Sequence, residues 1–246
     1  MGRAEILERA LAYPFPRPSG SVLIDDGRVH DLRELAPELV AGRTPVLAYG
    51  SNASPESLGW KFPEELDAVL PLVRGTLHDF DAVYSSHIAV YGSIPATLQR
   101  SPGTAVETFV AFLSAAQLAL VTDWEINATY ETMPVELELE LELELGEPPA
   151  EVGAFISRHG CLTADGAEIA LAEVAARGRR FTAMSQPQAL EHARSIAAPE
   201  LSLEELVVAS VEDYDRAREL TARLPAVPFG ASDARGGRSR RGDSNP

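Results

Sequence analysis

The sequence predicts an α+β protein in which a β-rich middle region is flanked by helices. Residues 69–113 are rich in apolar and β-branched side chains broken by Gly, Pro and Ser, which is typical of successive strands. Residues 135–145 alternate strictly between an apolar residue and Glu, which is the period of a strand. Apolar residues at helical spacing or helix caps mark four segments, 3–12, 115–124, 187–197 and 202–224.

The alternating segment is predicted to form a strand over residues 136–144. Glu and Leu both favour helices, but in a helix this alternation would place Leu on every side. A period of two instead puts every Leu on one face and every Glu on the other. We interpret the Glu row as a solvated sheet face rather than as a carboxylate ladder that collects cations.

Turn and cap residues predict further boundaries. Ser101-Pro102-Gly103 has the composition of a turn, and residues 153–162 read as one strand. Asp165-Gly166 is a hairpin signal. Ser202 with Glu205 matches a capping box at the start of a single helix over residues 202–224.

We divide the chain into three parts. Residues 1–43 form an N-terminal extension of short elements packed on the core. Residues 44–229 form the main domain with its C-terminal helices. Residues 230–246, rich in Gly, Ser, Asp and Arg, are predicted to be a disordered tail.

Composition narrows the range of partners and locations. The formal net charge of −16 argues against binding to nucleic acid or to anionic membranes, both of which need clustered Lys and Arg. Cys161 is alone, so no disulfide framework is expected. No signal peptide and no apolar run of about 18 residues is visible, so we expect a cytoplasmic protein without a membrane span.

The segment from Val46 to Asn52 is the feature that most suggests a site. A short apolar run ends in Tyr49-Gly50-Ser51-Asn52, as a buried strand ends in a turn. Such a turn leaves backbone N–H groups pointing outward, where they can cradle a carbonyl oxygen or an anion. An ordinary strand-ending turn explains the same residues.

Other catalytic patterns are missing from the sequence. The five His show no paired spacing, so no metal site is expected. There is no Gly-x-Ser-x-Gly, phosphate loop or dinucleotide fingerprint, so no cofactor is expected either. Ser51 follows a Gly after a strand and stays open as a non-standard nucleophile.

Among the carboxylates, Glu125 is the candidate general acid–base group. It continues the apolar face of Leu118 and Val121 and follows Trp124. A carboxylate beside an aromatic side chain can be partly desolvated, which suits it to proton transfer near neutral pH. The alternative is a helix-terminal Glu that is hydrogen-bonded to the loop after it.

These features occur in an order that resembles the γ-glutamylcyclotransferase-like family. The resemblance covers roughly residues 45–160. It is carried by Tyr49-Gly50-Ser51-Asn52, by Gly75-Thr76-Leu77 and Pro95-Ala96-Thr97-Leu98, and by Asp123-Trp124-Glu125 with Tyr130 nearby. It implies a small mixed β-barrel, closed or nearly closed, with helices around it. The segments before residue 44 and after residue 180 lie outside the usual family pattern.

The resemblance implies that a γ-glutamyl amine or amino acid is converted to 5-oxoproline and a free amine. Glu125 would be the proton shuttle, while Tyr49, Gly50, Ser51, Asn52 and Tyr130 would bind the small-molecule substrate, with no cofactor. The family's usual Leu-Asp-x-x-Glu-Gly is here Val121-Thr122-Asp123-Trp124-Glu125-Ile126, so Asp has moved one step and Gly is lost. Two alternatives follow: a binding module on the same barrel, and a related amine-releasing lyase that acts on a γ-glutamyl-protected metabolite.

Overall fold

The computed structural model describes residues 2–62, 69–141 and 148–231. Its helices are α1 (Arg3–Leu11), α2 (Pro37–Val40), the 3₁₀ turn η1 (Ser51–Ala53), α3 (Pro55–Gly59), α4 (Ala115–Trp124), α5 (Gln186–Ala197), α6 (Leu203–Glu212) and α7 (Tyr214–Thr221). Its strands are β1 (Val22–Asp25), β2 (Arg28–Asp31), β3 (Thr44–Ala48), β4 (Leu70–Tyr84), β5 (Ala96–Leu113), β6 (Ala128–Pro134), β7 (Leu137–Leu139), β8 (Glu151–Ser157), β9 (Cys161–Ala164), β10 (Ala167–Leu171), β11 (Ala176–Arg177), β12 (Thr182–Met184) and β13 (Ala226–Val227).

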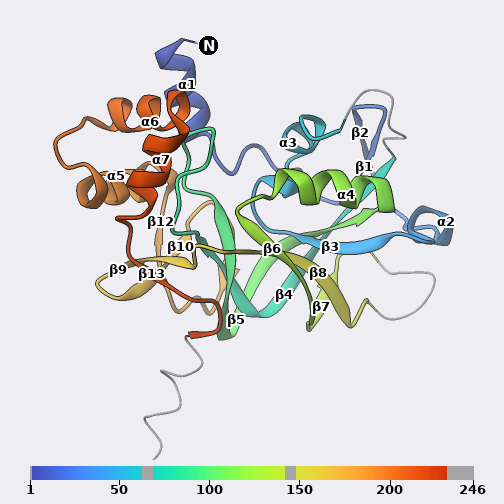
Figure 1. Ribbon diagram of the computed structural model, residues 1–246. Helices are drawn as coiled ribbons and strands as arrows, with labels where there is room; N and C mark the ends of the chain where they lie inside the picture. The colour runs from blue at the N-terminus through green and yellow to red at the C-terminus, as the bar shows by residue number, and fades with distance from the viewer. Residues whose placement is uncertain (1, 63–68, 142–147, 232–246) are drawn as a thin grey trace, which may run out of the picture.

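The long strands β4 and β5 form an antiparallel hairpin around which the other strands gather (Figure 1). On one half of this hairpin, β5 pairs with β3, β3 with β8, and β8 with β6. The chain then runs from β6 into β7, which pairs with β4. The sheet therefore curls back onto its own hairpin as a small barrel, and the predicted α+β fold class is confirmed.

The other half of the hairpin carries a second group of strands and helices. β10 pairs with β4, β9 with β10, and β13 with β9. Helices α5, α6 and α7 lie on this side together with α1 (Figure 1). Arg3 at the start of α1 donates from Nε to Glu204 of α6 at 3.0 Å, so the N-terminal helix packs on the C-terminal helices.

The apolar run 46–48 forms the buried part of β3. Val46, Leu47 and Ala48 are no more than 3% exposed. On the outside of the barrel, α4 covers this sheet with Val121, which packs in a cluster with Phe109 and Phe155. The end of β3 and the end of α4 are thereby held against the same sheet.

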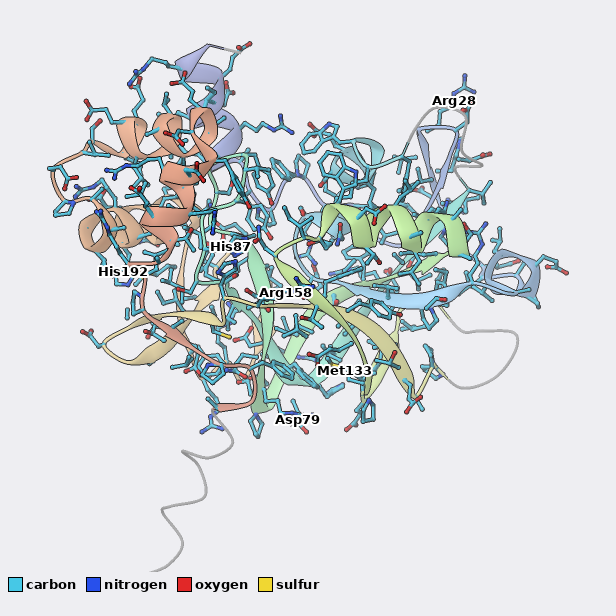
Figure 2. All side chains as sticks on the ribbon, viewed as in Figure 1. Arg28, Asp79, His87, Met133, Arg158 and His192 are labelled. Atoms are coloured by element: carbon cyan, nitrogen blue, oxygen red, sulfur yellow. The ribbon has the colours of Figure 1, made fainter. Side chains whose placement is uncertain are left out.

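The prediction of a turn at Ser101-Pro102-Gly103 is wrong. These residues lie inside β5, where they form part of a β-bulge. β4 pairs His78 with Ala105 and next pairs Phe80 with Arg100, so Asp79 alone faces four residues. Gly103 has φ +83° and donates its N–H to Asp79 Oδ1 at 2.7 Å. Turn-forming residues here widen a strand instead of reversing it. Figure 2 shows Asp79 at the lower end of the hairpin.

Two other predicted elements are each divided in two. The strand predicted over 153–162 is interrupted between β8 and β9, where Gly160 has φ +75° and the chain turns. The helix predicted over 202–224 begins at the expected capping box but breaks at Asp213. Asp213 has an extended backbone, and its carboxylate accepts from the Arg216 N–H at 3.0 Å, so it caps α7.

The alternating segment has the predicted two faces over its described part. Leu137 is buried, and Glu136, Glu138 and Glu140 are exposed. The regular strand is shorter than predicted, since β7 spans only Leu137–Leu139. Residues 142–144 of the prediction, and residues 232–246 of the predicted tail, lie outside the described residues.

The described helices are all short, and none of them is both long enough and apolar enough to cross a lipid bilayer.

Candidate functional site

A cavity of about 410 Å³ opens between the barrel, the N-terminal segment and the end of α4. Its wall joins segments that are far apart in the sequence: α1, the turn after β3, the end of α3, residues 87–96 and residues 123–128. This volume is within the range of about 300–1,000 Å³ that is typical of small-molecule sites.

The turn after β3 forms one wall of the cavity and depends on a glycine. Gly50 lies against the Tyr13 side chain, and a Cβ built on Gly50 would be 2.5 Å from the Tyr13 hydroxyl and 3.0 Å from the Ala96 Cβ. Ser51 then begins η1, and the Ser54 side chain accepts from the Ser57 N–H as the N-cap of α3. The turn is therefore packed closely on both sides.

Glu125 follows α4 directly and meets this turn. Asn52 Nδ2 donates to Glu125 Oε1 at 3.0 Å, and Lys61 Nζ donates to the same oxygen at 2.9 Å. Lys61 also donates to Asn52 Oδ1, so the three side chains form a closed set. Within the described residues Oε2 has no hydrogen-bond partner, and the Glu125 side chain is 26% exposed. One carboxylate oxygen is thus fixed, and the other is left for a ligand.

Two side chains of the turn are engaged by the protein itself. The Tyr49 hydroxyl donates to the carbonyl of Phe155, and burial raises the pKa of Tyr49 well above its usual value. The Ser51 side chain lies near the Tyr91 hydroxyl, whose pKa burial also raises. Neither hydroxyl is paired with a base that would activate it as a nucleophile.

Tyr130 lies apart from the other predicted substrate-binding residues. It is on β6, packs edge-on against Phe155 at 5.3 Å between ring centroids, and lies over Gly153. It lines a neighbouring hollow with Thr122 and Arg158 rather than the 410 Å³ cavity. Phe155 and Glu125 border both spaces.

The sequence alone did not point to the cationic and aromatic side chains of the cavity. Arg9 lines it from α1, Trp60 and Lys61 line it from just after α3, and Tyr91 lines it from the segment before β5. Tyr91 stacks on Tyr13, with the two ring planes 19° apart. No pattern in the sequence indicated that Lys61 pairs with Glu125 or that Trp60 lines the same cavity.

His87 lines the cavity and belongs to a stacked pair of histidines. Ser85 Oγ is 2.6 Å from His87 Nδ1 and 2.6 Å from Ser157 Oγ, and His87 stacks on His159 with centroids 4.7 Å apart. Burial, with a smaller contribution from the His159 charge, lowers the pKa of His87 to about 3. His87 is therefore neutral at physiological pH. It lies between the C-terminal helices and the barrel (Figure 2).

The described residues at this site do not include a cluster of metal-binding side chains. Across the described ranges, no three His, Cys, Asp or Glu side chains form a group that could hold a metal ion.

Comparison with known proteins identifies no family for this chain. No protein-family model matches the sequence, and no curated protein matches it. The chain is similar to the solution structure of At3g28950.1 from Arabidopsis thaliana, with 18% sequence identity and a TM-score of 0.33. The match covers 46% of this chain and 61% of that one, which is less than two thirds of its length.

Proposed function

We propose that this protein is a cyclotransferase-type lyase that converts a γ-glutamyl amine or γ-glutamyl amino acid to 5-oxoproline and a free amine. The observation that supports it most directly is the Glu125 carboxylate, which borders the cavity and is hydrogen-bonded to Asn52 of the Tyr49–Asn52 turn. The type of reaction that we propose comes from the resemblance of residues 45–160 to the γ-glutamylcyclotransferase-like family. A cytoplasmic location, as expected from the sequence, belongs to the same proposal.

The reaction is an intramolecular acyl transfer. The uncharged α-amine of the γ-glutamyl group attacks the γ-carbonyl carbon, and a C–N bond forms that closes a five-membered ring. The bond from that carbon to the departing nitrogen then breaks. A proton lost by the attacking nitrogen is gained by the departing nitrogen, so neither water nor a redox partner is consumed. Because both reacting groups belong to one molecule, the protein mainly has to fix its conformation.

In the proposed reaction, Glu125 carries that proton. Its Oε1 is held by Asn52 and Lys61, which supports the use of Oε2 to accept from the attacking amine. The same oxygen then donates to the departing nitrogen. Lys61 supplies the positive charge that balances Glu125 when the site is empty.

Backbone N–H groups of Gly50 and Ser51 are our candidates for stabilising the oxyanion. The Tyr13 hydroxyl lies beside this turn and accepts from the Ala96 N–H at 2.6 Å, so it borders the place where a substrate oxygen would meet these groups. Tyr49 supports the site through its bond to Phe155 rather than through a free hydroxyl. Tyr130 lines the neighbouring hollow, so in this proposal it acts on the substrate indirectly, through residues such as Phe155 and Glu125 that border both spaces.

One observation favours a second candidate, a small-molecule binding module on the same barrel. Glu125 is already ion-paired with Lys61, whose side chain is only 8% exposed. A carboxylate held in this way can serve as a fixed binding group without any proton transfer. The two candidates differ in whether the γ-glutamyl amide bond is broken.

The test is a product analysis with a panel of γ-glutamyl amides and γ-glutamyl dipeptides. We expect at least one compound to yield 5-oxoproline and free amine in equal amounts. Glutamate in place of 5-oxoproline would mean hydrolysis and would contradict the cyclisation. Binding without turnover across the panel would replace the enzyme with the binding module.

Ser51→Ala separates this mechanism from nucleophilic catalysis. We expect the variant to keep most of the turnover, because the Ser51 hydroxyl lies near the Tyr91 hydroxyl and, among the described residues, is hydrogen-bonded to no His or carboxylate that could act as a base. Abolished turnover, together with a covalent adduct in wild type by mass spectrometry, would make Ser51 a nucleophile.

A further inference from the structure

Arg9 lines the cavity and has no carboxylate partner among the residues that the structure describes. Its Nε is buried and makes no hydrogen bond, and in the described part of the chain its guanidinium pairs with no carboxylate. Two arginines of the barrel hairpin region do pair with carboxylates, Arg74 with Glu107 and Arg179 with Asp81. The chain has 37 acidic against 21 basic residues, so an unpaired guanidinium beside a cavity is not explained by a lack of carboxylates.

An aromatic ring holds this guanidinium in place. Arg9 Cζ lies 4.3 Å from the centroid of the Trp60 ring, and Phe15 contacts the edge of Trp60 at 5.0 Å between centroids. A guanidinium on an aromatic ring keeps its in-plane N–H groups available, and these match the two oxygens of a carboxylate.

The same cavity joins Arg9 to the candidate catalytic group. Arg9, Trp60 and Glu125 all line it, so one small molecule can contact both ends. Val90 and Tyr91 add apolar surface to the wall between the N-terminal segment and the hairpin. An anion, an apolar group and an amine are therefore complementary to this cavity.

We propose that Arg9, seated on Trp60, is a carboxylate subsite that selects the leaving group. The amine released is then an amino acid or a peptide with an apolar side chain, not a simple amine. This inference rests on the proposed cyclisation at Glu125 and adds a specificity-determining residue to it. Arg9 is on α1, which lies outside residues 45–160.

The binding test uses two ligands that differ only in a carboxylate, N-acetyl-phenylalanine and N-acetyl-phenethylamine. Both tryptophans of the chain, Trp60 and Trp124, line the cavity, so intrinsic fluorescence reports occupancy. We expect the carboxylate ligand to bind wild type about 10- to 100-fold more tightly, as one charge-assisted hydrogen-bonded pair provides. Arg9→Met keeps an apolar stem on Trp60 but should remove this difference.

The matched control is Arg3→Met on the same helix. Arg3 is exposed, pairs with Glu204 and does not line the cavity, so this variant should retain the preference. Arg9→Lys keeps the positive charge and should retain part of the preference for the carboxylate ligand. This variant keeps the test decisive even if Arg9→Met folds poorly. Equal binding of the two ligands by wild type, or no binding of either, overturns the subsite.

A turnover measurement separates the subsite from the reaction. γ-Glutamyl-phenylalanine should exceed γ-glutamyl-phenethylamine in kcat/KM, mainly through KM, and Arg9→Met should equalise the two. Carboxylate-dependent binding without any 5-oxoproline would refute the proposed cyclisation while the subsite stands. Equal turnover of both substrates by wild type would refute the subsite while the cyclisation stands.

Discussion

At the scale of single residues, Gly50 shows how closely the turn is packed. Alanine there would bring a Cβ to 2.5 Å from the Tyr13 hydroxyl, so the turn or the Tyr13 ring must shift. We expect Gly50→Ala to lower the free energy of unfolding by about 1–3 kcal/mol, as overpacking typically does. Gly59→Ala is the control, because a Cβ at Gly59 meets no atom within 4 Å and should change stability little. Urea unfolding of the two variants measures this, and equal effects would contradict the packing.

His87 predicts a dependence of stability on pH. Its pKa is about 3 in the folded chain and about 6.5 when unfolded, so the unfolded state binds more protons between these values. The stabilisation that depends on neutral His87 is therefore fully present above about pH 6.5 and is lost as the pH falls toward 3. The loss attributable to His87 should reach about 2 kcal/mol near pH 5.

The measurement is the free energy of unfolding of wild type and His87→Gln from pH 7.5 to pH 4.5. The variant should lose less stability on acidification, although His159, whose pKa burial also lowers, still contributes. Parallel pH profiles for the two proteins would show that His87 is not held neutral by its surroundings.

At the scale of elements, β7 tests the assignment of its two faces. Leu137→Glu places an unpaired charge where the side chain is 7% exposed, and we expect a loss of about 3 kcal/mol or more. Glu136→Gln, on the exposed face, should stay within about 0.5 kcal/mol of wild type. Thermal melts compare the two. Glu140 is a poor control, since it accepts hydrogen bonds from the backbone and side chain of Ser21.

Helices and strands with a regular apolar repeat or a capping motif could be predicted from the sequence. The places where a strand bulges or a helix breaks could not. The two faces of β7 follow from the alternation of Glu and Leu, and α4 from apolar spacing. The bulge at Ser101-Pro102-Gly103 could not be predicted, because the same residues suit a turn or a bulge, and only pairing with Asp79 decides. Asp213 likewise ends α6 and caps α7. The local sequence is also compatible with one continuous helix, so this break depends on tertiary packing.

At the scale of the whole molecule, the barrel brings together residues that no local pattern connects. The family resemblance over residues 45–160 assigns Asn52 and Glu125 to one site, and in the structure the two side chains are hydrogen-bonded. Lys61 and His87 lie inside that range, but they belong to no motif. Arg9 lies outside it and reaches the cavity only because α1 packs beside α6. Sequence reasoning thus indicated the centre of the candidate site but not its cationic edge.

The most direct test of the account is the initial rate of 5-oxoproline formation by wild type and by Glu125→Gln. The amide keeps the size of the side chain but cannot accept the proton of the attacking amine. We expect the rate to fall by roughly 10²–10⁴-fold, the range of a general acid–base group. The exposed carboxylate variant Glu131→Gln should keep the wild-type rate. A folded Glu125→Gln protein that still forms 5-oxoproline at the wild-type rate would contradict the assignment of Glu125 as the proton shuttle.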